Sequence, residues 1–507
     1  MKNLKTNGIN REIVILLLFS TVMNIAGYSS AAPAKQLKIQ TMGELFQQLR
    51  ERHPVFKLGA DQVQIEIQQR NSYLGAEDWV LSADSSISHF QTIQESESPN
   101  DIEQLSAGLG LSRHIWEAGG RVSMQWGFRR NHLNYPAWQN RLFQVDMDSY
   151  ENVLSLNYIH PLLKNSHGML DRTNYDASNY IVQAAAVNAR EQEEYFLLTA
   201  GLEFIDWVLL EEQIKILHQR IKLSNEQISQ VKKKLITNLV NKVDVLRAED
   251  SQRNTSQSLV LVEAHRDSKR NKLAELLRGA GLASVPQFAL YQKQDLPPIS
   301  VSNRYISEHS RATAHFSLQL SELSRRKESA AEETNAELSL IFGVAIKGGG
   351  IEARDTFDPS KQDASIGLHF SQPLGNRSAK SRLNKITLQI HALKLQRSRA
   401  LIDLRSQVAA LSSQLMRMGE LLDLNQQHIQ SAIMTTAEEL RLYNQGRNDL
   451  ATVILSQDRE QLARLSYANN AASYQRSLLQ LEALLDKLVP NSVAKPQTAI
   501  SLFTGEK

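Results

Sequence analysis

One uninterrupted stretch of helical sequence limits what this chain can fold into more than any other feature. Residues 376–444 contain no proline, and Gly419 is their only glycine. At a rise of about 1.5 Å per residue, a helix of this length is roughly 100 Å long and exceeds any globular core, so it must pack along other long helices. Its apolar residues recur at steps of three and four, which is typical of a coiled coil: Leu383, Ile386, Ile390, Leu393, Ala400, Leu404, Val408, Leu411, Leu415, Met418 and Leu422.

A second stretch, residues 165–236, has the same periodicity, and shorter helical stretches follow at 242–279 and 448–488. Each short stretch begins just after a break in the pattern, so each should fold back on the long helix before it. We therefore expect two antiparallel helical hairpins, at 161–280 and 373–488. An ordinary helical bundle is the alternative, although bundles rarely contain helices this long.

Other segments alternate between apolar and small or polar residues, which predicts β-strands. Residues 105–129 form a predicted β-hairpin around a turn at 117–120, and the same alternation occurs at 79–90, 154–159, 338–346 and 366–370. We place these strands in two sets, 79–160 and 337–372. Strands of about ten residues with one apolar face fit the wall of a membrane β-barrel, and the strands of a soluble sandwich are the alternative. About six strands are too few to enclose a wet lumen, so a barrel would require several chains.

The chain is internally duplicated. The strand-to-helix junction around Pro161 is repeated around Pro373, and the segment VDVLRAED at 243–250 is repeated as ATVILSQD at 451–458. The two offsets, 212 and 208 residues, agree within four. Each half is therefore predicted to contain strands, a long helix, a tight turn and a returning helix. Proline suits the junctions because it is tolerated at a strand end or a helix start.

The first residues predict an export signal. Lys2, Lys5 and Arg11 precede an apolar stretch at 13–26 and small residues, which predicts a signal peptide at 1–31 with cleavage after Ala31, or alternatively after Ala34. An uncleaved amphipathic anchor is the other interpretation. The chain has no cysteine and a net charge of only +3, which argue against a disulfide framework and a nucleic-acid partner.

The order of these motifs resembles that of the TolC-type outer membrane efflux proteins. The resemblance rests on the two proline junctions, the turns YNQGRNDLATVILSQD and LITNLVNKVDVLRAED, and the closing run LARLSYANNAASYQRSLLQLEALL. It covers residues 40–488 and implies a mainly α fold with a membrane β-barrel. In such proteins a homotrimer shares one outer-membrane barrel, and the long helices form a hollow coiled-coil α-barrel in the periplasm of a Gram-negative bacterium.

The resemblance also implies the roles of the remaining ranges and the partners. Residues 40–70 would form an N-terminal periplasmic helix, 281–303 an equatorial linker, 304–336 an ascending helix and 489–507 a C-terminal tail. The protein would serve as an exit duct for type I secretion or for efflux, together with a periplasmic adaptor and an inner-membrane transporter. The sequence does not decide the cargo. The hairpin 105–129 exceeds the family's minimum of two strands per half, so it either enlarges the barrel or packs outside it.

Candidate site residues lie at the turns of the two helical hairpins. Tyr443 and Asp244 match residues with which the family closes its periplasmic end, whereas Asn448 and Leu455 replace an arginine and an aspartate of the best-known member. We expect the periplasmic gate to comprise Asp244, Tyr443, Arg447 and Asp449, with Asp250 or Asp458 as further substitutes. The tips that meet an adaptor would comprise Asn238, Leu239, Val240, Gly446, Leu450 and Val453, with Asn238 replacing a turn glycine because it tolerates left-handed geometry.

The sequence offers little sign of catalysis. The 13 histidines are scattered without metal-ligand spacing, and Gly348–Gly350 lacks the lysine of a phosphate loop, so a surface loop between strands explains it better. We expect no enzyme activity, cofactor or metal site. A secreted coiled-coil scaffold or adhesin without a pore is the alternative function.

Overall fold

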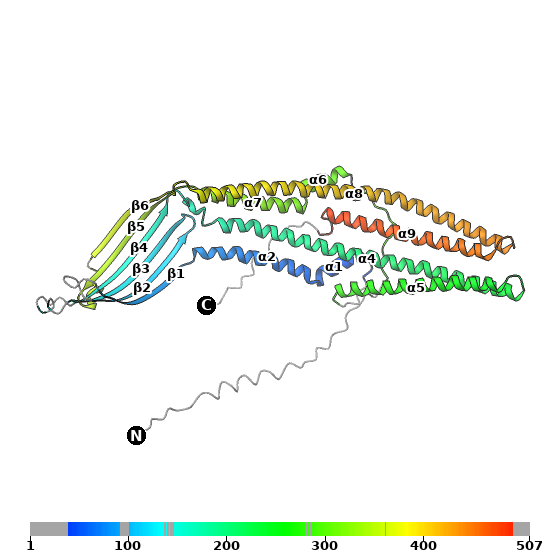
Figure 1. Cartoon of the computed structure of the whole chain (residues 1–507), viewed down its shortest axis with the longest axis horizontal. Coiled ribbons are helices and arrows are strands. Elements are labelled where there is room, and N and C mark those ends of the chain that lie inside the picture. Colours follow the sequence, from blue (N-terminus) through cyan, green and yellow to red (C-terminus); the bar gives the residue numbers. More distant parts are fainter. Residues whose placement is uncertain are drawn as a thin grey trace, which may run out of the picture.

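The computed structural model describes residues 39–91, 101–135, 138, 141, 147–278, 282, 285–359 and 361–489. The predicted signal peptide and residues 490–507 of the predicted tail lie outside these ranges. The described chain is elongated, with a β-sheet at one end and long helices running away from it (Figure 1). Within the described ranges, no helix has the length and apolar character needed to cross a membrane.

Among the described residues, six strands form one antiparallel sheet in sequence order. They are β1 (Val80–Gln91), β2 (Asp101–Ile115), β3 (Gly120–Asn134), β4 (Met147–Pro161), β5 (Glu337–Gly350) and β6 (Lys361–Ser371). The expected hairpin at 105–129 is β2–β3, and it pairs without interruption with β1 on one side and β4 on the other. The hairpin therefore enlarges the sheet and does not pack outside it.

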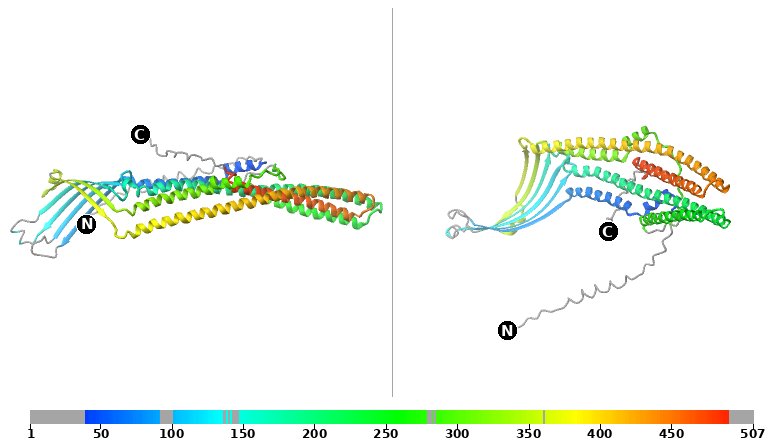
Figure 2. Two further views of the ribbon diagram at one scale, coloured as in Figure 1. Left: turned by 90° about the horizontal axis from the view of Figure 1, so that it is seen from above. Right: turned by 45° about the vertical axis from the view of Figure 1, so that its right-hand side comes forward.

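Four helices lie side by side next to the sheet, in the order α2 (Pro54–Ser72), α4 (Thr173–Ile236), α7 (Arg311–Glu332) and α8 (Arg377–Asn444). Further from the sheet, α5 (Lys242–Leu276) and α9 (Leu450–Leu484) replace α2 and α7 as neighbours of the long helices (Figure 2). The predicted fold class, mainly helical with two long hairpins and an antiparallel sheet, is confirmed. Its physical basis is the heptad pattern, because Val408, Leu415 and Leu422 of the predicted stripe are buried.

The largest core lies midway along the helices. Phe204 and Trp207 of α4 pack edge to face there, with ring centroids 5.8 Å apart, and neither is more than 1% exposed. The short helix α1 (Met42–Arg52) buries Leu45 and Leu49 in the same cluster, and α6 (Ile299–Glu308) buries Ile306. This core joins both helical hairpins to the N-terminal segment.

Two predicted helices are each divided in two. The expected helix at 40–70 is α1 and α2, because Pro54 cannot continue a helix and the His53 ring accepts a hydrogen bond from Val55 N at 3.3 Å. The expected helix at 304–336 is α6 and α7. Ser310 separates them, since its hydroxyl accepts a hydrogen bond from Thr313 N at 3.2 Å and starts a new helix.

The junction after β4 also differs from the prediction. Helix α4 begins at Thr173 and not near residue 165, because Asn165, His167 and Gly168 all have positive φ in a turn that contains the short η2 (Ser166–Gly168). The three glycines at 348–350 lie in β5, where a loop was expected. A Cβ on Gly348 would lie 2.2 Å from the Thr356 carbonyl oxygen, so glycine is needed there for η3 (Ala353–Phe357) to pack against the strand.

Candidate functional site

The sheet has two chemically different faces, and one of them is apolar and uncovered. Strand alternation places a set of large apolar side chains from all six strands on this face, and each has 37% to 85% of its surface exposed. Within the described chain the short η3 lies against this face near Gly348, and the long helices do not pack across it, so these side chains stay exposed in a single chain. This face includes Leu81, Ile87, Leu105, Leu109, Met124, Leu154, Leu156, Phe342, Val344, Ile346, Ile366, Leu368 and Phe370.

The opposite face of the sheet is polar and hollowed. Its hollow has a volume of about 490 Å³, and its lining includes small residues such as Ser82, Ser106, Gly108, Gly110 and Ser155. Four of its charged side chains pair across neighbouring strands. Arg129 pairs with Glu151 at 3.5 Å, and Lys347 pairs with Asp363 at 2.5 Å. A sheet that is apolar on one face and wet on the other has the character of a membrane pore wall.

The second candidate site is formed by the two hairpin turns at the end opposite the sheet. Asn238 and Gly446 both have left-handed backbone, with φ of 56° and 72°. The carboxylates beyond them hold helix starts. Asp244 accepts a hydrogen bond from Asn241 N at 3.1 Å in a capping box, and Asp449 accepts one from Thr452 N at 2.9 Å. Two of the four predicted gate residues thus also stabilise helix ends.

A small apolar cluster joins the two tips. It comprises Val231, Val245, Ala248, Tyr443, Leu450 and Val453. Leu450 is 1% exposed and Val453 is 0% exposed, so the prediction that they present an apolar docking surface is wrong. Their spacing at the start of α9 instead turns both side chains toward the first hairpin. Leu239 is 73% exposed, as a docking residue requires, and Val240 is partly buried against the cluster.

Tyr443 is the predicted gate residue with the most distinctive surroundings. Its ring is buried in the tip cluster, and Lys234 Nζ lies 3.9 Å from the ring centroid. Burial chiefly, and the nearby negative charge of Asp244, raise the pKa of Tyr443. The phenol therefore stays protonated, and its hydroxyl has no hydrogen-bond partner within the part of the chain that the structure describes.

The other predicted gate charges are less enclosed. Hydrogen bonds from Thr452, and then the charge of Arg247, lower the pKa of Asp449. Arg447 is exposed and forms no ion pair with a residue of the described ranges. The structure therefore brings Tyr443 of one hairpin close to Asp244 of the other, and Asp449 close to Arg247, whereas Arg447 faces solvent.

Sequence reasoning missed Arg220, which links the two hairpins above the tips. Its side chain is 4% exposed. It donates hydrogen bonds to Asp458 at 2.9 Å and Gln457 at 2.9 Å on α9, and to Ser251 at 3.2 Å on α5. A signal was present in the sequence, because Arg220 lies between Leu217 and Ile221 of the apolar stripe. Asp458, considered as a gate substitute, is thus engaged within its own chain.

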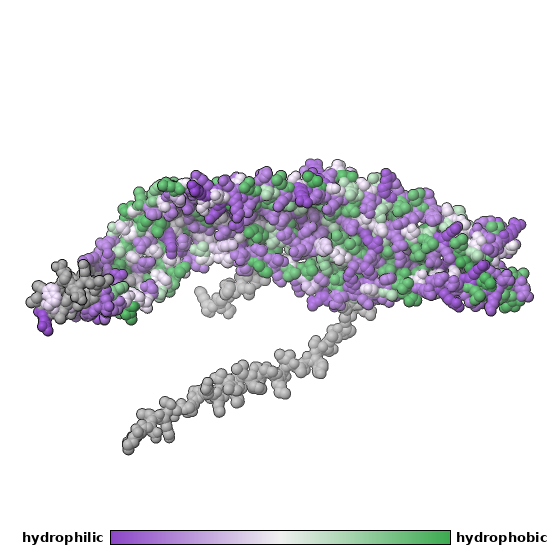
Figure 3. All heavy atoms as spheres, in the orientation of Figure 1, coloured by the Kyte–Doolittle hydropathy of each residue, from purple (hydrophilic) through white to green (hydrophobic). Residues whose placement is uncertain are grey.

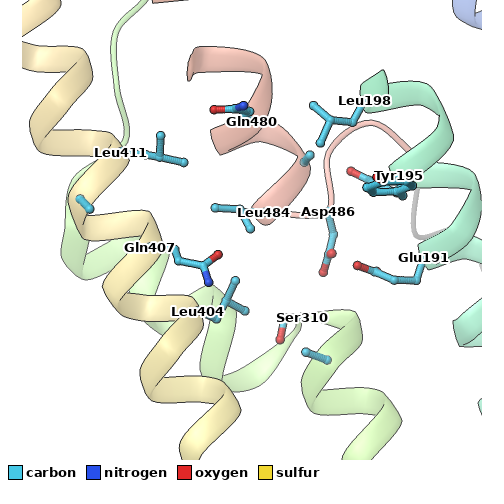
Figure 4. Close-up of a pocket in the computed structure, with 14 residues that line it drawn as sticks. Glu191, Tyr195, Leu198, Ser310, Leu404, Gln407, Leu411, Gln480, Leu484 and Asp486 are labelled. Atoms are coloured by element: carbon cyan, nitrogen blue, oxygen red, sulfur yellow. The ribbon is translucent and has the colours of Figure 1, made fainter. Parts of the chain in front are cut away.

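A hollow of about 510 Å³ lies between α4, α7, α8 and α9 near the middle of the helical part (Figure 4). Leu404, Leu411 and Leu484 give it an apolar side, while Glu191 and Asp486 lie together at another. Arg311, 5% exposed, partly offsets the charge of this acidic side through ion pairs with Glu194, with Asp486 at 3.1 Å and with Glu191 at 3.5 Å. Glu194 also accepts hydrogen bonds from the backbone of Leu488 and Val489, so the cluster fixes the chain after α9.

No protein-family model and no curated protein sequence matches the chain. Solved structures of outer membrane channels do match it. CusC superposes with a TM-score of 0.64 at 13% identity, covering 91% of this chain and 95% of CusC. The open-state MtrE channel of Neisseria gonorrhoeae gives 0.63 at 13%, covering 91% and 94%. VceC of Vibrio cholerae gives 0.62 at 12%, covering 88% and 95%. The resemblance noted in the sequence is thus confirmed at the level of the fold.

Proposed function

We propose that the protein is an outer-membrane exit duct that carries substrates from the periplasmic side of a Gram-negative cell to the outside. The observation that carries this proposal is the form of the sheet. One face is apolar and exposed, the opposite face is polar and contains a hollow, and the edge strands β1 and β6 each have one neighbouring strand. Water does not favour so much exposed apolar surface, which weakens the alternative of a secreted scaffold or adhesin. The likeness to outer membrane channels supports the same interpretation.

The two open edges favour a homotrimer. Unpaired strand edges are not tolerated in lipid, so a single sheet must be closed by further copies of the chain. β1 runs away from the helices and β6 runs back toward them (Figure 1), so β6 of one chain would meet β1 of the next in antiparallel pairing. The helices would then surround a periplasmic tube. Such a duct would receive cargo from an inner-membrane transporter through a periplasmic adaptor, in efflux or in type I secretion.

The test of this proposal is fractionation and conductance. The mature protein should be found in the outer membrane, migrate as a heat-modifiable trimer in detergent and conduct ions in a planar bilayer. The proposed duct requires no catalytic residue, cofactor or metal ion. Water-soluble material without conductance would contradict the proposal and favour the scaffold.

The tips are proposed as the gate and the docking end of the duct. Tyr443 and Asp244 would hold the resting closed state, with Arg447 and Asp449 facing the same opening, at about 1 kcal/mol for each polar contact. Arg447 is exposed and is free to contact a neighbouring copy. The Tyr443 hydroxyl is unpaired within the described chain but buried, so it could meet a new partner only when the tips move. For docking we retain Leu239 and Val240 beside the turn residues Asn238 and Gly446. Leu450 and Val453 would support this surface from inside.

The gate is tested by combining Tyr443→Phe with Asp244→Asn. Asparagine keeps the oxygen that caps α5 and removes only the charge, so the tip should stay folded. We expect a higher resting single-channel conductance and greater sensitivity of cells to large antibiotics. Unchanged conductance in assembled trimers would place the constriction elsewhere.

Docking is tested by site-specific photo-cross-linking at Leu239, with Leu261 as the control. Both side chains are well exposed, at 73% and 63%, but Leu261 lies far along α5 from the tip. Position 239 should yield an adduct with a periplasmic protein, and position 261 should not. Equal adducts at both positions, or none at 239, would remove the docking assignment.

A further inference from the structure

Within the part of the chain that the structure describes, the hairpin β2–β3 has no helical counterpart. Each of the other strands continues into one helix of the four-helix layer. α2 leads through η1 (Tyr73–Glu77) to β1, β4 leads to α4, α7 leads to β5, and β6 leads to α8. The helices α2, α4, α7 and α8 follow the same lateral order as these four strands. The hairpin therefore inserts two strands between β1 and β4 without adding a helix.

The turn of this hairpin is fixed to the helical part. Trp116 is 6% exposed, its backbone N–H donates to a Glu77 carboxylate oxygen at 3.0 Å, and its ring lies 5.9 Å from that of Tyr175 at the start of α4. Gly119 and Gly168 allow the turn to approach the junction closely. A Cβ on Gly168 would lie 1.7 Å from the Trp116 carbonyl oxygen. Such fixed packing is expected of a permanent part of the wall.

The added strands make the sheet as wide as the helical layer. A strand tilted by about 40° occupies about 6 Å of circumference, so six strands span about 38 Å. Four helices packed at about 9 to 10 Å also span about 38 Å. Four strands at the same tilt would span only about 25 Å, which is less than the four helices span.

We infer that hairpin β2–β3 widens the membrane barrel to the bore of the helical tube, so that the duct admits cargo too wide for a barrel with four strands per chain. This inference rests on the proposed trimeric duct. Three chains of six strands make 18 strands, with a backbone diameter of about 36 Å, against about 24 Å for 12 strands. Small residues on the hollow face, such as Gly108 and Ser106, leave most of that width open.

The lining supports passage of bulky cargo. Strand alternation places Phe90 on the hollow face, and it is the only phenylalanine, tyrosine or tryptophan there among the described strand residues. Four charged side chains at mid-height form two opposite-sign pairs, Arg129 with Glu151 and Lys347 with Asp363, and among the described residues Asp84 adds a single unpaired carboxylate. A lining of this kind offers few aromatic rings for stacking and few unpaired charges to hold a passing molecule.

The test begins with the position of the hairpin. The natural chain has no cysteine, so single substitutions report accessibility cleanly. Gly127 of β3 and Gly367 of β6 lie on the hollow face, and a Cβ at either would meet nothing within 4 Å. Gly127→Cys and Gly367→Cys should react with a membrane-impermeant thiol reagent on whole cells. Their neighbours Phe128→Cys and Leu368→Cys, on the apolar face, should not.

The width is tested with thiol reagents attached to neutral polymers of increasing size, added from outside the cell. Reagents about 20 Å across should reach Gly367→Cys in the full-length chain. When β1 is joined directly to β4, so that the hairpin is deleted, the largest reagent that still reaches this cysteine should be about 10 Å smaller. Equal cut-offs would overturn the inference. If the shortened chain does not assemble, the intact chain decides alone. Exclusion of reagents 20 Å across overturns the inference, and admission supports it.

Failure of the inference is distinguishable from failure of the proposed function. If Gly127→Cys is unreactive while Gly367→Cys reacts in outer-membrane trimers, the hairpin is not part of the pore wall, and the duct remains. If the protein is water-soluble and all four cysteines react alike, there is no membrane barrel, and both the inference and the proposed function fail.

Discussion

Arg220 links the two helical hairpins through a buried side chain. Its guanidinium is almost fully buried and bonds to α5 and α9 from α4. Below it, the tip cluster and the Lys234–Tyr443 contact join the same hairpins again. Movement of one tip away from the other would have to break these contacts within the chain, whatever additional contacts a neighbouring copy supplies.

We therefore predict that Arg220→Met loosens the tips while leaving assembly intact. Methionine fills much of the same space, and Asp458, whose side chain is 44% exposed, can be solvated when its partner is lost. The expected cost is about 1–3 kcal/mol per chain. Resting conductance of purified trimers should rise. Arg253→Met is the matched control, since its ion pair with Glu249 is exposed and 3.8 Å long. Equal behaviour of the two variants would contradict this role.

A second residue-scale prediction concerns pH. Desolvation opposes ionisation of Asp206, but hydrogen bonds from Lys269 and Arg476 outweigh it and lower the pKa of this carboxyl. A carboxyl whose pKa is lowered in the folded state stabilises the protein at pH values above its unfolded-state pKa of 3.8. This stabilisation is lost as the pH falls through the folded-state pKa. Asp206→Asn should therefore lower the thermal midpoint at pH 7, at a cost of about 1–2 kcal/mol.

The pH profile separates this effect from a loss of packing. The gap between the wild type and Asp206→Asn should close as the pH is lowered from 5 toward 2, because the wild-type carboxyl then becomes protonated as well. Thermal unfolding followed by circular dichroism at each pH measures the gap. A gap that stays constant across this range would show that charge is not its cause.

At the scale of elements, the contact between the β2–β3 turn and the β4–α4 junction joins the sheet to the helices. Gly168 has a φ of 65°, and a Cβ there would collide with the Trp116 carbonyl. Gly168→Ala should therefore displace the turn and lower the temperature at which trimers dissociate, since both backbone strain and steric overlap act against it. The expected cost is about 2–4 kcal/mol per chain.

Gly127→Ala in the same hairpin is the control, because a Cβ there meets nothing within 4 Å and the strand has ordinary backbone. Heat-modifiability on gels measures dissociation for both variants. If Gly168→Ala dissociated at the wild-type temperature, the turn would not be an anchor.

The sequence predicted the long-range plan of the molecule better than its local breaks. Heptads and strand alternation are repeated many times, so they identify α4, α8 and the six strands even where a single residue breaks the pattern. Breaks depend on one or two residues. The cap at Ser310 and the left-handed turn at Asn165 form through hydrogen bonds that no periodicity reveals.

The same distinction applies to the candidate site. The turn positions Asn238 and Gly446 were predictable because left-handed geometry restricts the residue type. The burial of Leu450 and Val453 was not, because it depends on how the second hairpin packs against Val231 and Val245 of the first. Arg220 was missed for a related reason, since its partners on the other helices are 31 to 238 residues away in sequence.

At the scale of the whole molecule, the two parts of the chain face different surroundings. Hydrophobic and hydrophilic residues are mixed along the visible face of the helices, without a continuous apolar band (Figure 3). The sheet instead separates them onto opposite faces. In the proposed trimer, lipid would therefore surround only the sheet, and the helices would extend into water.

This division predicts that the cost of a charge in β6 depends on the face it occupies. Ile366 is 71% exposed on the apolar face, and Ser365 beside it is on the hollow face. Ile366→Lys should cost about 2–4 kcal/mol per chain, because lysine near the middle of the bilayer loses its hydration, whereas Ser365→Lys keeps its charge in the wet lumen. The cost would recur in each copy of the trimer. Folding yield into lipid vesicles should therefore fall steeply for Ile366→Lys and little for Ser365→Lys, and similar yields for the two would mean that the apolar face of the sheet does not meet lipid.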